Sequence, residues 1–185
     1  MSSAKSGSVI GASFGLIFVL VNTGSLPAAV AVLLRVLAVV AFVAVLIAAV
    51  VAGRRPSVAG LDRPTAGGFT LGYWLVVVAE VGVIAAGLVV LKGPLHVPEG
   101  AVAWVAQVVG VHFIALAVVW KLVFFHGLGA ALVFCGVAGL VLAATGSAVS
   151  AINLVGGVLP GAILLGFGLW GASRSADSPA VKSVP

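Results

Sequence analysis

Most of the 185-residue chain consists of long apolar runs separated by short segments rich in glycine, proline and charged residues. A helix needs about 20 apolar residues to cross the hydrocarbon core of a bilayer. The runs predict six transmembrane helices, at about 9–24, 27–52, 69–91, 101–125, 128–145 and 148–171. We therefore expect an all-α polytopic transmembrane bundle, with residues 1–172 forming a single domain.

The polar interruptions mark the helix boundaries with unequal clarity. Pro27 suits the first turn of a helix, because its missing N–H would have no partner there. The first run, read alone, also fits a signal peptide, but we interpret it as a span. The boundary between the fourth and fifth helices, near 124–129, is the least distinct, and a bundle of five helices is the alternative. The polar tail, 173–185, is expected to be disordered in the cytoplasm.

Composition indicates that lipid, rather than water, is the solvent of this chain. Hydrophobic residues make up 63% of it and charged residues 7%, whereas a soluble domain carries about 25% charged residues. The formal net charge of +5 does not indicate nucleic-acid binding, because the basic residues are dispersed over loops.

The basic residues instead predict an orientation. If the N-terminus is inside, the cytoplasmic side collects most of the nine Lys and Arg residues, namely Lys5, Arg54, Arg55, Arg63, Lys121, Arg174 and Lys182. The outside keeps Lys92, and Arg35 lies within a helix. Because basic loops favour the cytoplasmic side, we predict that both termini are cytoplasmic in a multi-pass protein of the bacterial cell (inner) membrane.

Arg35, Glu80 and His112 are the basic, acidic and histidine residues that lie away from the ends of the predicted spans. At 1.5 Å per residue, Glu80 lies roughly 16 Å into the third helix, near the middle of a bilayer core about 30 Å thick. His112 lies at a similar depth in the fourth helix, and Arg35 about 12 Å from the outer end of the second. All three could therefore share one layer. In one interpretation, Arg35 is the charge partner of Glu80 and His112 a hydrogen-bonded neighbour; Arg35 could instead extend to the outer interface.

A second interpretation makes Glu80 and His112 catalytic. Without a cation beside it, a carboxyl group in lipid favours its neutral, protonated form and can donate a proton. Aromatic residues predicted near this layer, Tyr73, Trp104, Phe113 and Trp120, could bind substrate and stabilise a positive centre. The alternative role for Tyr73, Trp104 and Trp120 is anchoring at the membrane interface.

No motif indicates a metal or a cofactor. The histidines and Glu80 do not follow metal-ligand spacing, and the single cysteine, Cys135, lies within an apolar run. Small residues recur four apart at Gly11/Gly15, Gly82/Ala86 and Gly157/Gly161, a spacing that lets helix backbones approach closely. Such faces could close the bundle or support an oligomer.

Two short segments carry a resemblance to known proteins. Gly72-Tyr73-Trp74 followed by Ala79-Glu80, and Val109-Gly110-Val111-His112-Phe113, resemble a pattern in small bacterial membrane proteins. More distantly, the chain resembles the bacterial membrane-embedded terpene cyclases that act on prenylated indoles or diketopiperazines. The resemblance implies that Glu80 protonates an epoxide or alkene in an aromatic-lined pocket. It departs from that family in having one intramembrane carboxyl, because Asp62, Glu99 and Asp177 lie in predicted loops or the tail.

Three functions follow from these residues. The first is an enzyme that cyclises a lipophilic, isoprenoid-type substrate within the bilayer, with Glu80 as proton donor and His112 as its partner. The second is a small proton-coupled transporter or channel. The third is a non-catalytic subunit of a membrane complex. The shape of the space beside Glu80 distinguishes them, because an apolar pocket favours an enzyme and a polar passage favours transport.

Overall fold

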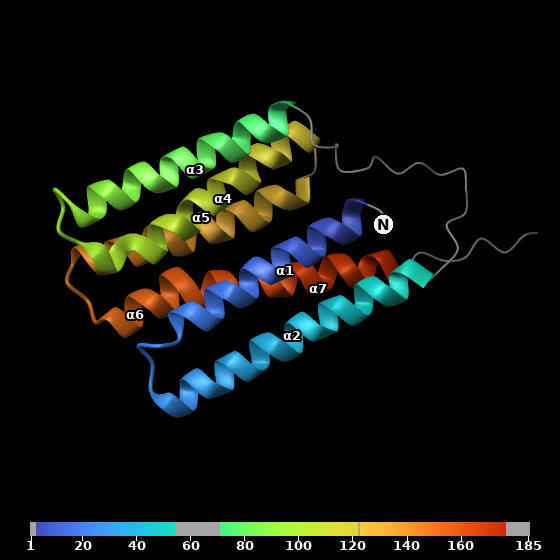
Figure 1. The fold of residues 1–185 in the computed structure, drawn as a ribbon, viewed down its shortest axis with the longest axis horizontal. Coiled ribbons are helices and arrows are strands. Elements are labelled where there is room, and N and C mark those ends of the chain that lie inside the picture. Colours follow the sequence, from blue (N-terminus) through green and yellow to red (C-terminus); the bar gives the residue numbers. More distant parts are fainter. Residues whose placement is uncertain (1–2, 55–70, 122, 177–185) are drawn as a thin grey trace, which may run out of the picture.

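The chain folds into a bundle of antiparallel helices, as predicted (Figure 1). The computed structural model describes residues 3–54, 71–121 and 123–176, and no strand occurs among them. The predicted polar loop and C-terminal tail fall largely in 55–70 and 177–185, outside the described residues. The elements are α1 (Ser3–Asn22), α2 (Ala28–Arg54), α3 (Leu71–Lys92), η1 (Pro98–Gly100), α4 (Ala101–Trp120), α5 (Val123–Ala144), α6 (Val149–Asn153), η2 (Leu154–Val158) and α7 (Leu159–Ala176).

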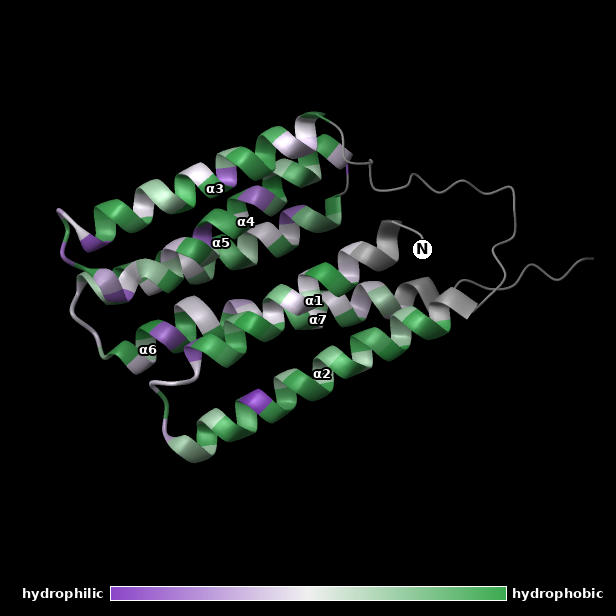
Figure 2. Cartoon of the chain, viewed as in Figure 1, coloured by the Kyte–Doolittle hydropathy of each residue, from purple (hydrophilic) through white to green (hydrophobic). Residues whose placement is uncertain are grey.

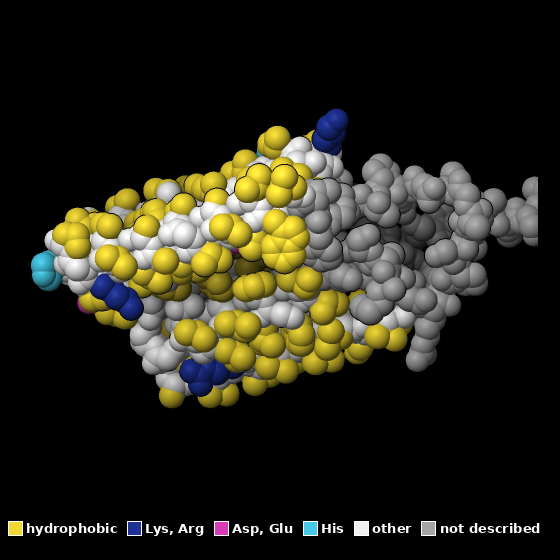
Figure 3. Space-filling model, turned by 45° about the horizontal axis from the view of Figure 1, so that its top comes forward, with side chains coloured by type: hydrophobic (Ala, Val, Ile, Leu, Met, Phe, Trp, Pro, Cys, Tyr) yellow, Lys and Arg dark blue, Asp and Glu magenta, His cyan; other side chains and the backbone are white. Residues whose placement is uncertain are grey.

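Among the residues that the structure describes, five segments are long and apolar enough to cross a membrane: α2, α3, η1 with α4, α5, and the continuous run from α6 to α7. The apolar part of α1, Gly7–Asn22, is shorter. Hydrophobic colour dominates α2 to α5 (Figure 2), and apolar side chains cover much of the described surface on the face shown in Figure 3. This protein is therefore a multi-pass membrane protein, because so much exposed apolar surface is stable only in lipid.

The helices form a central group with one helix on each side. The pairs α4–α5 and α1–α7 pack closely in the centre, α3 packs mainly on α4, and α2 packs on α7 and α1. Figure 1 shows α2 and α3 at opposite edges of the bundle. Both edge helices expose long rows of valine and leucine. This arrangement decides which intramembrane polar residues can meet.

Glycine allows the central helices to approach closely. A Cβ added to Gly136 of α5 would lie 2.5–2.7 Å from the Cβ, N and Cα of Gln107 on α4. A Cβ at Gly15 of α1 would lie 2.7 Å from the carbonyl oxygen of Gly161 on α7. Added Cβ atoms at Gly11 and Gly82, by contrast, would meet nothing within 4 Å. Only some of the small residues predicted to pack therefore do so within this chain.

The last span contains a wide helical turn. The segment α6, η2 and α7 is continuous, and η2 is a π-helix. Pro160 follows it and has no N–H to donate to a carbonyl one turn earlier, where its ring would also crowd the backbone. A π-turn is one way in which a helix accommodates such a break. The wide turn carries Gly156 against Ala103 of α4 and Gly157 against Asn22 of α1.

The boundary between the fourth and fifth helices differs from the prediction. α4 ends at Trp120, and Lys121 adopts the left-handed conformation (φ 55°, ψ 37°), with its N–H bonded to the carbonyls of Ala117 and Val118. α5 then starts at Val123 instead of near residue 128. A left-handed residue closes an α-helix because it turns the chain away from the helix axis. The following aromatic residues thus belong to α5, where they pack on other helices.

Candidate intramembrane acid–base site

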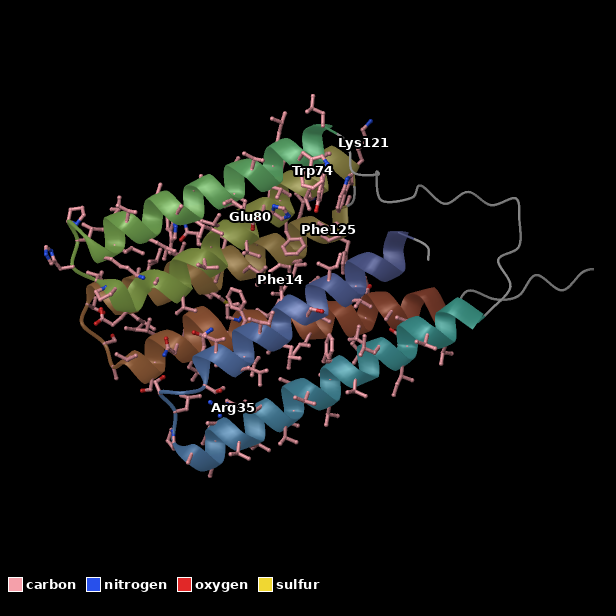
Figure 4. All side chains as sticks on the ribbon, in the orientation of Figure 1. Phe14, Arg35, Trp74, Glu80, Lys121 and Phe125 are labelled. Carbon is pink, nitrogen blue, oxygen red and sulfur yellow. The ribbon has the colours of Figure 1, made fainter. Side chains whose placement is uncertain are left out.

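The site lies where α3 crosses α4. The two helices are antiparallel, and three contacts follow one register: Tyr73 with Trp120, Glu80 with His112, and Gly87 with Trp104. In Figure 4, Glu80 extends from the middle of α3 toward α4. Counting 1.5 Å per residue from Leu71, Glu80 lies about 14 Å along α3. The structure thus brings Glu80 and His112 together near mid-helix, at the level that the sequence indicated.

The carboxylate and the imidazole are in direct contact. His112 Nδ1 lies 3.0 Å from Glu80 Oε2, and the two side chains are 13% and 18% exposed, respectively. Nδ1 is buried and has no partner at hydrogen-bond angles, so the contact is primarily electrostatic. It becomes an ion pair when the imidazole is protonated. A carboxyl and an imidazole this close can exchange a proton after a small rotation of either side chain.

A cavity of about 250 Å³ adjoins this pair. Its lining comes from one face of α3 and one face of α4, with residues spaced three or four apart as helical geometry requires. Besides Glu80 and His112, the lining residues are Val76, Ala79, Val83, Trp104, Gln107, Val108, Val111 and Ala115. The cavity is therefore an apolar space with a small polar group on its wall, which is typical of sites for lipophilic ligands.

Gln107 was not predicted as a site residue, yet it lines the cavity. Its Oε1 atom is buried without a hydrogen-bond partner among the described residues. Burying a polar atom in this way costs about 1–3 kcal/mol. Gln107 shares this wall of α4 with Trp104 and His112, and its position among them was the signal that could have marked it as a site residue.

Trp104 is held in place by α3. Its Nε1 donates a hydrogen bond of 3.2 Å to the carbonyl oxygen of Val83. The indole lies over Gly87, where an added Cβ would sit 2.0 Å from two ring atoms. Trp104 therefore packs across the helix pair and forms one wall of the cavity.

The other predicted aromatic residues form a cluster beside the cavity and do not line it. Tyr73 stacks on Trp120 with ring centroids 6.0 Å apart, and Trp120 meets Phe125 edge to face at 5.8 Å. Phe125 stacks on Phe113 at 5.6 Å, and Phe113 meets the imidazole of His112 edge to face at 5.7 Å. These rings form a continuous chain of contacts from His112 to one end of the bundle. Of them, Phe113 contacts His112 directly. The sequence did not indicate Phe125, because the helix boundary was misplaced there.

Arg35 is not the charge partner of Glu80. Its Nε donates a hydrogen bond of 2.8 Å to Thr23 Oγ1, in the turn between α1 and α2. The two residues lie on edge helices at opposite sides of the bundle (Figure 4), so a direct contact is excluded by the fold. Sequence placed them at similar depth, but depth alone does not specify which helices are neighbours.

A larger cavity, about 660 Å³, lies between the start of α5 and the end of α7. It is lined by Val123, Phe124, Gly127, Ile163, Gly166, Phe167 and Trp170. None of these side chains is ionisable, so this groove offers no acid or base. The α3–α4 site is therefore the better candidate for chemistry, despite its smaller volume.

Among the described residues, no group of three or more His, Cys, Asp or Glu side chains could hold a metal ion. The polar groups available at the site are thus a carboxyl, an imidazole and a carboxamide.

Comparison of the chain with protein-family models, with curated proteins and with solved structures finds no match.

Proposed function

We propose that this protein is an enzyme of the cell membrane that cyclises a lipophilic, isoprenoid-type substrate by acid-initiated catalysis. The observation that supports the proposal most directly is the Glu80–His112 contact on the wall of a mostly apolar cavity. An acid–base pair is costly to keep in lipid, and such groups usually serve a function.

In the proposed reaction, protonated Glu80 donates its proton to an alkene carbon or an epoxide oxygen of the substrate. The resulting carbocation closes a ring by attack of a second double bond, and Trp104 stabilises the positive charge by cation–π attraction. The cyclised cation then loses a proton to His112. The 3.0 Å contact provides the route by which that proton returns to Glu80. One proton enters and one leaves, so no further reactant is required.

The size of the cavity sets a limit on what it can hold. Its volume of about 250 Å³ is slightly below the roughly 300–1,000 Å³ typical of small-molecule pockets. We propose that only the reacting end of the substrate enters between α3 and α4, while the rest remains in the bilayer. α3 packs mainly on α4 and lies at the edge of the bundle. The reacting end of the substrate would therefore enter from the lipid beside this helix pair, without passing between other helices.

The experiment compares substrate conversion by membranes containing the wild type, Glu80→Gln and Glu99→Gln, using prenylated and epoxidised aromatic compounds. Loss of a general acid lowers the rate by roughly 100-fold or more, so Glu80→Gln should lose most product formation. Glu99 is an exposed acid in η1, and its variant should convert substrate at the wild-type rate. Unchanged conversion by Glu80→Gln would exclude the acid role.

A proton-coupled transporter is the second candidate, since a carboxyl–imidazole contact near mid-helix is also the minimum element of a proton relay. The same variants, reconstituted in liposomes containing a pH-sensitive dye, test it. Proton flux in the wild type that disappears in Glu80→Gln, without conversion of any substrate, would favour transport. Neither activity in any variant would favour a non-catalytic subunit.

A further inference from the structure

A second polar cluster lies at the end of the bundle where α1 passes into α2. It consists of Asn22, Thr23, Ser25, Arg35 and Asn153, and it joins α1, α2 and α6. Asn153 Nδ2 donates to Ser25 Oγ at 2.9 Å, and Asn22 Nδ2 donates to the carbonyl of Phe18 at 2.8 Å. These bonds fix the turn on which Arg35 depends.

Thr23 orients the guanidinium of Arg35. The threonine is fully buried, and its hydroxyl donates to the Leu20 carbonyl at 3.2 Å while accepting the 2.8 Å bond from Arg35 Nε. One edge of the guanidinium is therefore anchored to a rigid turn. Figure 4 shows Arg35 extending from α2 toward this turn. Its two terminal amino groups make no hydrogen bond to the described part of the chain.

The fold supplies no anion to Arg35 within the described residues. The carboxylates in these ranges are Glu80, which contacts His112 at the opposite side of the bundle, and Glu99, which forms no ion pair with it. Arg35 is itself exposed on a helix that faces lipid. An arginine within a membrane helix is costly to hold without an anion, and an anion from outside the chain would offset part of that cost.

The position of Arg35 suits a phosphate at the membrane surface. Arg35 lies about 10 Å along α2 from Ala28, and its side chain is directed back toward the helix start, where headgroups lie. The planar guanidinium offers paired N–H donors that match phosphate oxygens. We propose that Arg35, oriented by Thr23, forms a binding site for the phosphate of an anionic phospholipid in the leaflet at the α1–α2 turn.

The test measures the binding of lipids to the full-length protein in neutral detergent, by the shift of its melting temperature. Phosphatidylglycerol should stabilise the wild type, whereas diacylglycerol with the same chains and inorganic phosphate at equal concentration should not. Arg35→Gln should weaken phosphatidylglycerol binding by about tenfold or more, the effect of losing a charge-assisted hydrogen bond. Lys92→Gln provides the matched control, because Lys92 is an exposed cation at the same end of the bundle.

Thr23→Val keeps the shape of the buried residue and the charge of Arg35 but removes the anchoring bond. It should weaken binding by a smaller factor than Arg35→Gln, and it remains informative if the latter does not fold. Equal binding by wild type and Arg35→Gln would overturn the proposal. So would equal loss in Lys92→Gln, equal stabilisation by diacylglycerol, or equal stabilisation by inorganic phosphate.

Discussion

At the scale of single residues, contacts within the membrane decide which polar groups act together. Glu80 contacts His112, whereas Arg35 bonds to Thr23. Glu80 therefore has a partner that can accept or return a proton, whereas Arg35 has a neutral hydroxyl partner. The pairing of a carboxyl with a titratable imidazole, instead of a permanently charged guanidinium, is what makes proton transfer at Glu80 chemically reasonable.

The position of Trp104 can be tested through the glycine beneath it. Gly87→Ala places a methyl group within the space of the indole, so the ring must move and its hydrogen bond to Val83 must lengthen or break. We expect a loss of about 1 kcal/mol in stability and, if the cavity binds substrate, reduced conversion. Thermal unfolding followed by circular dichroism and the conversion assay measure the two effects.

Gly82→Ala is the control on the same helix, because its methyl group would meet nothing within 4 Å. The double variant Gly87→Ala, Trp104→Phe distinguishes the cause. If Gly87→Ala is equally harmful in the presence and absence of the indole, the effect does not act through Trp104.

At the scale of helices, close backbone approach holds α4 against α5 and leaves α3 at the edge. The contact between α4 and α5 contains three glycines, Gly110, Gly129 and Gly136. In lipid, packing of this kind replaces the hydrophobic effect as the force that associates helices. α4 thus presents His112 and Trp104 from a rigid support, while α3 carries Glu80 on a less constrained helix.

Gly136→Ala tests this rigidity. The new Cβ would lie within 2.7 Å of backbone atoms of Gln107, which cannot move without displacing α4. Overpacking of this kind costs about 1–3 kcal/mol, so the melting temperature of the solubilised protein should fall by several degrees. Gly127→Ala, also in α5 but with open space around its Cβ, should melt like the wild type. Similar melting of both variants would mean that α4 and α5 are not in close contact.

At the scale of the whole molecule, the bundle has two ends that differ in chemistry. The end at the α1–α2 turn carries the Arg35 cluster, and the other end carries the aromatic cluster around Phe125. The distribution of basic residues predicts that the aromatic end faces the cytoplasm. The proposed phosphate site would then face the outer leaflet.

Cysteine labelling in intact cells tests this orientation. His96→Cys, in the loop after α3, should react with a membrane-impermeant maleimide, whereas Lys121→Cys, after α4, should react only once the cells are permeabilised. Both positions are exposed. The native Cys135 is buried, with 3% of its surface exposed, so the unmodified protein should give a low background. The reverse labelling pattern would contradict the predicted orientation.

The amino-acid sequence by itself determined where the membrane spans lie and how deep each residue lies within its span. Runs of about 20 apolar residues specify spans, and the constant rise of a helix places Glu80 and His112 at one depth. The tertiary structure alone decided which helices are neighbours. The packing of the helices keeps Arg35 away from Glu80. It also places Trp104 and Gln107 on the cavity wall and Phe125 in the aromatic cluster.

The physical reason is that these helices are apolar on all sides. In a soluble protein, a hydrophobic stripe marks the face that packs inward; in lipid, the outward face is equally hydrophobic and no stripe remains. Helix contacts then depend on where small residues let backbones approach. The sequence does not show which small residues do so: Gly82 and Gly136 both lie within apolar helices, but of these two only Gly136 packs against another helix. Depth could therefore be read from the chain, whereas the partner of Glu80 depended on the packing of α3 against α4.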